Sequence, residues 1–266
     1  MPKEIDPTSS IKDKTIAKEA KALAEKLKSI TGAYESQAEK SIFVHMPSKI
    51  LLLHELLETH PLLHTSYPGQ YRTEMMAKLS LSADETDATT LPSKRARVEI
   101  DDAPIDISDE LKAKRNGILS RSNESFIELL AQMKAQVHDL LEIVGHAKMW
   151  IQLNIPRIED GNNFGVSIQE ETVAELSRAE DAVLGLLDGS FKFLVQRGRL
   201  VAKIIKHPEV EDYIRALVEM DEKELLNFRI NYNDLKNNYQ VLYDILLKNM
   251  DKIRKPRGTT SSDAYF

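Results

Sequence analysis

The sequence predicts an all-α protein built as an up-down bundle of four long helices. Apolar residues recur at alternating spacings of four and three over three segments of more than thirty residues, and each segment stops at a proline or a turn-rich stretch. Only 6% of the 266 residues are aromatic and only ten are glycine, which disfavours a β-rich fold. Helices of this length are rods of roughly 45 to 65 Å, and equal rods joined by short loops favour a bundle.

The first helix of the bundle is predicted within residues 1–58, starting near residue 11, with the residues ahead of it expected to be disordered. Pro47 is expected to kink or split this helix, because proline removes a backbone donor from the helical ladder. The apolar positions that define it are Ile11, Ile16, Leu23, Leu27 and Ile30 in the first half, and Ile50, Leu53, Leu56 and Leu57 in the second.

Residues 59–121 are predicted to form a flexible linker. The apolar pattern dissolves there into Pro, Ser, Thr, Asp and Glu, and no sustained face remains except a short helix expected near residues 73–79. The linker crosses between the first and second helices of the predicted bundle.

Residues 122–257 carry the other three helices. Ser122 or Asn123 is expected to cap the second helix, and Ser167 with Glu170 is predicted to form a capping box for the third. The predicted seams are Phe126, Leu130, Met133, Val137, Leu140, Val144, Ala147 and Ile151 in the second helix; Leu184, Leu187, Phe191, Leu194, Val201 and Ile205 in the third; and Phe228, Tyr232, Leu235, Tyr239, Leu242, Leu246 and Ile253 in the fourth.

A compact turn interrupts this regular pattern at residues 155–166. Pro156 ends the second helix, and the run Asp160-Gly161-Asn162-Asn163 supplies residues that tolerate left-handed backbone and cap themselves. In an up-down bundle this loop lies at the same end as the end of the fourth helix. The loop and the C-terminal segment are therefore predicted to share one face, presented by a rigid bundle.

Enzyme and cofactor signals are weak throughout the chain. His54-Glu55-Leu56-Leu57-Glu58 is one residue away from a helical zinc-hydrolase pattern, and Gly161 with Gly165 lacks the Lys-Ser/Thr of a phosphate loop. We therefore expect no catalytic residue, metal or cofactor. The net charge of −6 opposes general nucleic-acid binding, and the sequence has no cysteine, no apolar run of membrane-spanning length and no secretory leader. No membrane partner is expected, and the chain should stay on the cytosolic or nuclear side.

Lys94, Arg95 and Arg97 form a basic cluster inside the otherwise acidic linker. Exposed, extended clusters of this kind suit a nuclear-import receptor, whereas plain solvated charge explains them equally well from the residues alone.

The last four residues, Asp263, Ala264, Tyr265 and Phe266, put two aromatic rings and a carboxylate after the flexible stretch Gly258-Thr-Thr-Ser-Ser. A frayed terminus is usually polar, whereas an aromatic end with a carboxylate suits an apolar pocket that contains a lysine. The eleven residues from Pro256 can extend about 35 Å. The sequence therefore predicts a docking tail at residues 258–266.

The run MWIQLNIPRIEDGNNFGVSIQEETV at residues 149–173 resembles the activation-loop region of the REG family of proteasome activators, also called eleven-S regulators, and is most similar to its gamma member. HPEVEDY at 207–213, DEKE at 221–224 and KPR at 255–257 resemble the same family. The resemblance covers residues 123–257 well and the first helix only around residues 43–57.

The resemblance implies four-helix protomers in a seven-membered ring that caps the α-subunit face of the core proteasome without ATP or ubiquitin. It implies that C-terminal tails dock and that the activation loop opens the gate, so that peptides and unstructured proteins are degraded. Asn162 matches the family's critical loop asparagine. The basic cluster resembles the gamma member's nuclear signal and favours the nucleus over the cytoplasm. The alternative is an oligomeric helical scaffold that presents its loop to another partner without opening a gate. The loop residues implied are Arg157, Ile158, Glu159, Asp160, Gly161, Asn162, Asn163, Phe164 and Gly165.

Overall fold

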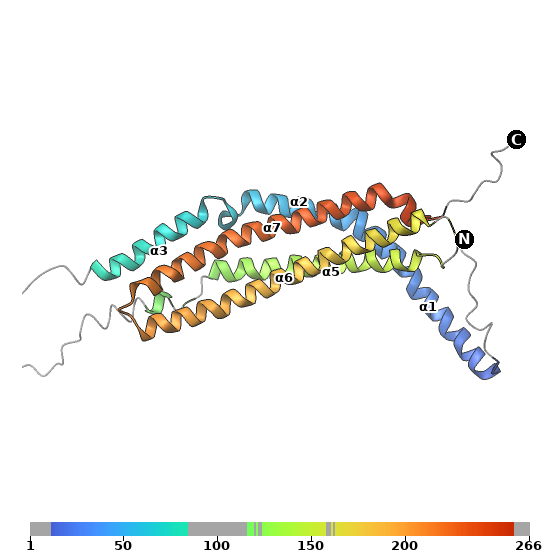
Figure 1. Cartoon of the computed structure of the whole chain (residues 1–266), viewed down its shortest axis with the longest axis horizontal. Coiled ribbons are helices and arrows are strands. Elements are labelled where there is room, and N and C mark those ends of the chain that lie inside the picture. Colours follow the sequence, from blue (N-terminus) through green and yellow to red (C-terminus); the bar gives the residue numbers. More distant parts are fainter. Residues whose placement is uncertain are drawn as a thin grey trace, which may run out of the picture. The chain divides into compact units, whose positions relative to one another are not determined.

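All regular structure in the described part of the chain is helical, as predicted. The computed structural model describes residues 12–84, 116–119, 121, 124–157, 161 and 163–257. The elements, shown in Figure 1, are α1 (Lys14–Lys40), the π-helix η1 (Ser41–His45), α2 (Met46–Thr59), the 3₁₀ turn η2 (Pro61–Leu63), α3 (Tyr67–Asp84), α5 (Glu124–Asn154), α6 (Phe164–Lys206) and α7 (Glu211–Arg254).

The helices contribute to two compact units. The first unit comprises Met1–Glu55, Lys134–Leu186 and Asn233–Phe266, and the second comprises Leu56–Met133 and Leu187–Tyr232. Each unit has its own buried core, so each is described by itself.

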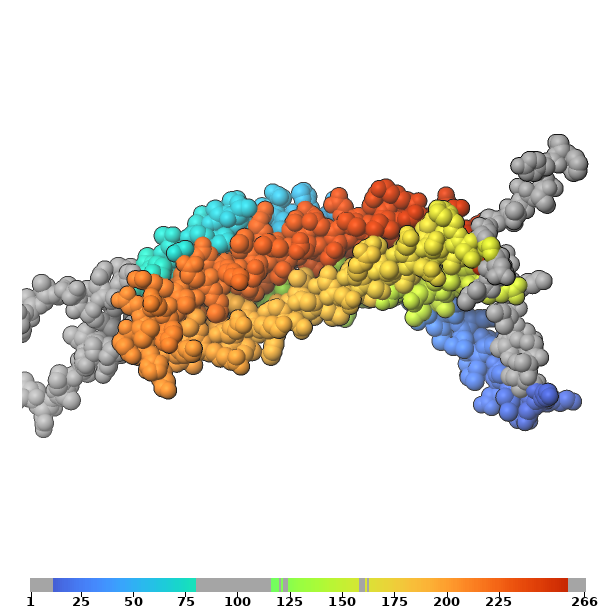
Figure 2. Space-filling view, viewed as in Figure 1, coloured from blue at the N-terminus to red at the C-terminus, as the bar shows by residue number. Residues whose placement is uncertain are grey.

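The first predicted helix is interrupted by a π-helix rather than by a simple kink. Pro47 has no N–H, so it cannot bond to the carbonyl of Phe43. One residue earlier, the N–H of Met46 bonds to the carbonyl of Ser41, five residues back, which is the π-helical pattern. Ala38, at the end of α1, and Ser41 and Ile42, in the π-helix, are buried. The N-terminal part of α1 stands clear of the other helices of the unit (Figures 1 and 2). Asp13 caps α1 by accepting a hydrogen bond of 2.8 Å from the N–H of Thr15.

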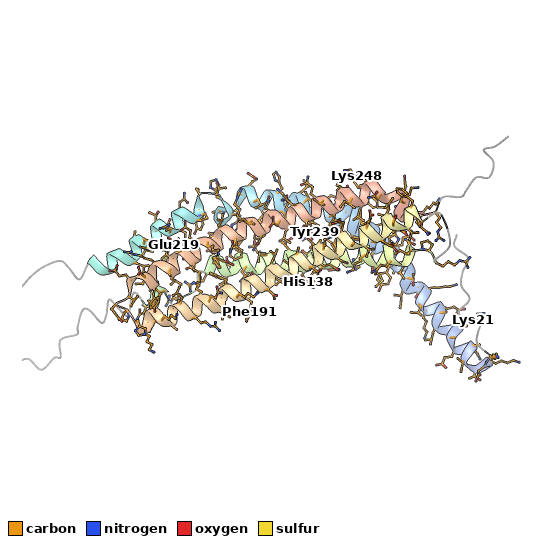
Figure 3. All side chains as sticks on the ribbon, in the orientation of Figure 1. Lys21, His138, Phe191, Glu219, Tyr239 and Lys248 are labelled. Atoms are coloured by element: carbon orange, nitrogen blue, oxygen red, sulfur yellow. The ribbon has the colours of Figure 1, made fainter. Side chains whose placement is uncertain are left out.

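The predicted seams of the second and fourth helices are confirmed. Every seam residue named for these two helices is buried in α5 or α7. Tyr239, labelled in Figure 3, is fully buried, and Tyr232 is fully buried too and donates a hydrogen bond of 3.0 Å to the carbonyl of Leu129. These tyrosines therefore pack in the core rather than stack on a ligand.

The predicted seam of the third helix is largely wrong. Leu184, Phe191 and Ile205 are 47%, 68% and 48% exposed, and Figure 3 shows Phe191 on the outside of α6. The buried positions of α6 are shifted by about one residue, because several apolar side chains flank the true seam and the 4-3 pattern alone does not choose between the two faces. The buried apolar set is Leu176, Ala179, Val183, Phe193, Val201 and Ile204.

The predicted linker is shorter than expected at both ends. Residues 67–84 form the helix α3, where a short helix was expected only near 73–79, and residues 116–119 form a helical turn. Tyr71 and Leu79 are buried, and Leu79 packs with Leu119 in a small apolar cluster of the second unit. Tyr67, Tyr71, Met75 and Leu79 recur every four residues, but this apolar pattern is short and is followed by a long stretch rich in Ser, Thr, Asp and Glu, which is typical of a linker.

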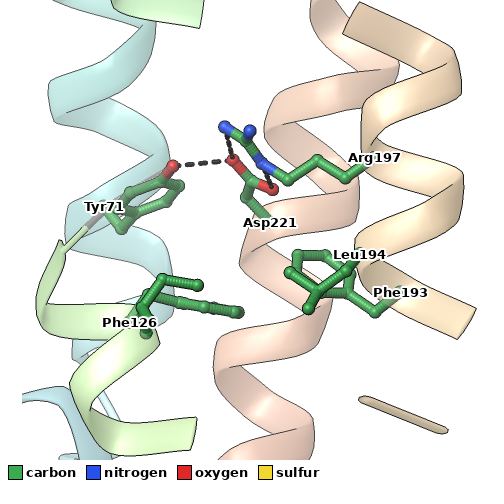
Figure 4. Close-up of a pocket in the computed structure, with 7 residues that line it drawn as sticks. Tyr71, Phe126, Phe193, Leu194, Arg197 and Asp221 are labelled. Carbon is green, nitrogen blue, oxygen red and sulfur yellow. Dashed lines mark hydrogen bonds and ion pairs between the residues drawn. The ribbon is translucent and has the colours of Figure 1, made fainter. Parts of the chain in front are cut away.

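A buried charged network joins α3, α6 and α7 in the second unit (Figure 4). Asp221 accepts hydrogen bonds from Tyr71 Oη at 2.9 Å and from Arg197 Nε at 2.9 Å and NH2 at 3.3 Å. The adjoining cavity has a volume of about 10 Å³, room for a single water. The network therefore holds helices together rather than binding a ligand.

Candidate functional site

The interhelical loop and the root of the C-terminal segment meet at one end of the first unit. α5 ends at Asn154, α6 begins at Phe164, and α7 ends at Arg254. Three contacts, described in turn below, hold the start of α6 against the end of α7. The predicted placement of the loop beside the C-terminal segment is thereby confirmed for the root of that segment.

Gly165 lies directly against the backbone of Pro256. A Cβ atom added to Gly165 would sit 1.9 Å from the carbonyl oxygen of Pro256 and 2.6 Å from its carbonyl carbon. These distances are far inside van der Waals contact, and the obstacle is backbone rather than a movable side chain. Only glycine allows α6 and the segment after α7 to approach this closely.

Gln169 bridges the ends of all three helices. Its Nε2 donates to the carbonyl of Ile253 at 2.8 Å and to that of Asn154 at 3.4 Å, and the residue is fully buried. Carbonyls in the last turn of a helix lack partners within the helix, so Gln169 satisfies one such group on α5 and one on α7. Its Oε1 is buried and accepts no hydrogen bond from the residues that the structure describes.

Charged and polar groups add a second layer at the same end. Arg257 NH2 donates to Asn163 Oδ1 at 3.2 Å, which ties the last residue of the loop to the C-terminal segment. Arg254 NH2 bonds Glu39 Oε1 at 2.7 Å, which brings α1 to the same end of the unit. Both pairs are exposed, so their geometry matters more here than their small energies.

The loop itself is shaped by two residues. Pro156 follows the last turn of α5, and Gly161 adopts φ = 83°, a conformation that L side chains rarely adopt. Arg157 is exposed, while Ile158, Glu159, Asp160 and Asn162 lie outside the described residues. The predicted loop end at residue 166 is corrected to 163, because Phe164 and Gly165 already belong to α6.

The predicted capping box is wrong for the same reason. Ser167 lies inside the first turn of α6, where its N–H bonds the carbonyl of Asn163 at 3.0 Å and its Oγ donates to the carbonyl of Phe164 at 2.8 Å. The helix starts four residues earlier than the predicted cap at Ser167 implies. As a consequence Phe164, 71% exposed, stands at its first position.

Two other predicted sites fall outside the described residues. These are the docking residues Asp263, Ala264, Tyr265 and Phe266, and the import residues Lys94, Arg95 and Arg97. Both remain predictions.

One further hollow lies in the first unit beside the π-helix. It is a half-open groove of about 270 Å³ lined by His45, Lys49 and His146 among others. His146 Nδ1 shares a hydrogen bond of 3.2 Å with Ser41 Oγ, and Lys49 pairs with Asp139 and donates to Gln136 at 3.0 Å. Among the residues that the structure describes, no three His, Asp or Glu side chains are grouped to hold a metal ion.

None of the helices within the described ranges combines the length and the apolar character that crossing a bilayer requires.

Sequence reasoning missed Gln169, Pro256 and Glu39 as parts of this site. The spacing of Gly165, Gln169 and Thr172 by four and three residues places these residues on one helix face, which is the buried face of α6. A polar residue on a buried face indicates a specific hydrogen-bond partner. Pro256 and Glu39 carried none, because their roles depend on which helix ends meet.

The described residues form a helical protein in which the interhelical loop and the start of the C-terminal segment are held together at one end of the first unit. Residues 119–263 match the family described as "Proteasome activator PA28, C-terminal". The chain is 38% identical over 236 residues to the human protein named "Proteasome activator complex subunit 3", covering 86% of this chain and 91% of that protein. It therefore belongs to the PA28 family of proteasome activators.

A second relative and two solved structures support the same family or the same fold. "Proteasome activator 28" of Dictyostelium discoideum is 41% identical over 147 residues, which cover 55% of this chain and 65% of that protein. Among solved structures, the 11S subunit PA28 of the Plasmodium falciparum proteasome has a TM-score of 0.64 and 30% identity, with 96% of this chain and 98% of that chain covered. Trypanosome PA26, solved with the yeast 20S proteasome, has a TM-score of 0.53 at 15% identity over 88% and 97%, and shows the shared fold.

Proposed function

We propose that this chain activates the core proteasome by docking on its α-subunit face and opening its gate. In this account the tail residues 263–266 enter pockets of the α subunits and supply binding. The loop residues 157–165 then contact the gate and favour its open state. A protein that binds the open conformation better than the closed one shifts the gate without ATP or any covalent chemistry.

The fastening of the loop to the root of the tail carries this proposal. Gly165 against Pro256, Gln169 on Ile253 and Arg257 on Asn163 hold the loop against the root of the C-terminal segment. When a tail is seated in its pocket, the loop of the same protomer is then held within the reach of residues 258–262 from that pocket. Loosely connected segments would bind without delivering the loop to one place.

Self-assembly supplies the affinity that one short tail lacks. A single tail that buries two aromatic rings binds weakly, whereas several tails on one rigid ring act at high effective concentration. The ring is a homo-oligomer, and the number seven rests on the family resemblance. The chain acts as a regulator and not as a catalyst, and it needs no cofactor.

The proposal is tested by binding and stimulation measured on the same samples. Deletion of residues 264–266 should abolish co-sedimentation with purified core proteasome and should abolish stimulation of peptide hydrolysis. The oligomeric mass of the truncated chain should match that of the intact one. Full stimulation by the truncated chain would contradict docking through the tail.

We also propose that the chain is imported into the nucleus through Lys94, Arg95 and Arg97. The motivation is the density of cations in an otherwise acidic segment. Replacing the three by alanine in a fluorescent fusion should move the protein to the cytoplasm. An unchanged nuclear signal would reduce the cluster to solvated charge.

A further inference from the structure

The N-terminal part of α1, residues 14–36, is a helix with an apolar face that no other described residue of the chain covers. We call it the arm. Leu23, Leu27 and Ile30 are 53%, 61% and 54% exposed, and Ile16 is 55% exposed. Together with Ala20 and Tyr34 they follow alternating spacings of four and three, which place all six on one stripe. Figure 3 shows the arm, marked by Lys21, standing clear of the other helices of the unit.

Such a helix is not stable by itself in water. Isolated helices of this length are marginal, and helices in proteins owe most of their stability to the packing of an apolar face. Exposed large apolar side chains in one continuous stripe are typical of an interaction surface. At about 1.5 Å per residue the arm is about 35 Å long, so its partner must offer a long surface.

The position of the arm's root restricts where that partner can lie. Ala38 is fully buried and Glu39 bonds Arg254, so the arm leaves the first unit at the end that carries the loop. In a cyclic ring all protomers have the same orientation, and their loops lie at one face. The root of the arm therefore lies at the same face of the ring as the loop and the start of α6 of the next protomer.

Charge selects α6 among the helices at that end. The arm has five lysines against three glutamates, whereas residues 164–186 of α6 have five acidic residues against the single Arg178. In the first unit, residues 134–154 of α5 have no net charge, and residues 233–254 of α7 have four basic and three acidic groups. The segment of α6 is thus the one acidic helix among these three.

The outer face of that α6 segment has a second feature that its own fold does not require. Ala174, Asp181 and Gly185 are exposed on the side opposite the core, and a Cβ added to Gly185 would meet nothing within 4 Å. Glycine inside a helix is less favourable than alanine. Ala174 and Gly185 leave room for a second helix on this face, one on each side of the exposed Arg178.

We propose that the arm of one protomer packs along the outer face of α6, residues 170–185, of the next copy of this chain. The proposal rests on the proposed ring and assigns to it a head-to-tail interface. Lysines that flank the stripe lie near Glu170 and Asp181 of the neighbour. One protomer's arm and its own α6 face then serve two different neighbours.

The first test measures oligomeric mass in the absence of proteasome. Leu23→Gln with Leu27→Gln removes the stripe, and Glu25→Gln with Ser29→Gln is the matched control on the opposite face of the same helix. Circular dichroism of each variant reports whether the bundle is folded. The stripe variant should be monomeric and the control should keep the wild-type mass. A stripe variant of unchanged mass, or a monomeric wild-type chain, overturns the proposal.

Mixing distinguishes the α6 surface from a pairing of two arms. Gly185→Leu blocks the α6 face, with Gly145→Leu as its control on α5, where an added Cβ also meets nothing within 4 Å. The stripe variant and the Gly185→Leu variant should each be monomeric alone and form dimers, but no larger species, when mixed. Dimers formed by Gly185→Leu alone would mean that arms pair with arms, and would overturn the assignment to α6.

Cross-linking gives a readout that folding defects do not imitate. The chain has no cysteine, so Leu27→Cys in one copy and Ala174→Cys in another should be joined by a short thiol cross-linker, whereas Glu25→Cys with Ala174→Cys should not. Equal yields from both pairs overturn the proposal. None of these measurements uses the proteasome, so a failure of the proposed gate opening would not change their results. A stripe variant that still forms rings and still stimulates the proteasome would overturn the arm contact and leave the proposed gate opening intact.

Discussion

Gln169 on α6 donates a hydrogen bond of 2.8 Å to the carbonyl of Ile253, in the last turn of α7. This one side chain connects the helix that follows the loop with the helix that precedes the tail. Gln169 and Ile253 are both fully buried, so this hydrogen bond is made away from water. The position of the loop therefore depends on a contact that neither the loop nor the tail contains.

Gln169→Ala should destabilise the bundle and weaken gate opening. The substitution removes a buried hydrogen bond to the Ile253 carbonyl, and the loss of a partner for a buried polar group costs about 1 to 3 kcal/mol. Thermal unfolding should shift to lower temperature, and stimulation should fall more than binding does. Gln240→Ala, an exposed position on α7, is the control and should leave both unchanged. Equal behaviour of the two variants would show that the bridge has no role.

Gly165→Ala should separate the start of α6 from Pro256. The added methyl group meets backbone at 1.9 Å, so the two segments must move apart. We expect a lower unfolding temperature and loss of stimulation. Gly145→Ala is the control, because its Cβ meets nothing within 4 Å and alanine favours the helix by about 1 kcal/mol. A Gly165→Ala protein with wild-type stimulation would mean that the loop tolerates displacement.

Tyr71→Phe should lower stability without changing activation. The substitution removes one of the hydrogen bonds to the buried carboxylate of Asp221, and such bonds to charged groups contribute about 1.5 to 3 kcal/mol. The bonds from Arg197 remain. Chemical denaturation measures the loss. A stable protein with reduced stimulation at ordinary temperature would contradict the structural role assigned to this network.

Glu224→Gln should stabilise the chain at neutral pH. Burial raises the pKa of the Glu224 carboxyl above its usual range, against the opposing effect of the hydrogen bond from Asn227 Nδ2. The folded chain thus holds this proton more tightly than the unfolded chain, whose pKa is about 4.3. The free energy of unfolding therefore falls as pH rises through the interval above about 4.3.

The advantage of Glu224→Gln over the wild type should accordingly shrink as pH is lowered below about 4, where both states of the wild type are protonated. Unfolding temperatures of the two proteins across this range provide the measurement. A difference that grows toward acid pH would contradict the sign of the shift.

The helices were predictable to the extent that apolar spacing decides burial. The predicted seams of α5 and α7 coincide with the buried faces of those helices, whereas Leu184 and Phe191 of the predicted α6 seam are exposed. All three helices carry exposed apolar residues beside the seam, and spacing alone does not select the face that is buried. The start of α6 at Phe164 was missed because Ser167 offers a more typical cap. Most of helix α3 lies outside the predicted short helix at 73–79, because its described core contribution is limited to the buried Tyr71 and Leu79 and the partly buried Met75 and Met76.

The candidate site was predictable as a topology but not as contacts. Counting helix reversals places the loop and the C-terminal segment at one end, and the approach of Gly165 to Pro256 agrees with it. The fastening by Gln169 and Arg257 depends on the relative rotation of three helix ends, which spacing does not determine. The arm was read as an ordinary bundle helix, because a stripe that packs on another copy looks the same in sequence as one that packs within the chain.

The central claim is that the loop opens the gate after the tail has docked. The most direct measurement is hydrolysis of fluorogenic peptides by purified, closed-gate core proteasome without ATP, in the presence of the wild-type chain or of Asn162→Tyr. The account predicts stimulation by the wild type alone, with equal binding of both proteins to the core particle. Equal stimulation by both, or binding of an intact wild-type ring without any stimulation, would contradict it and favour a scaffold that presents its loop to another partner.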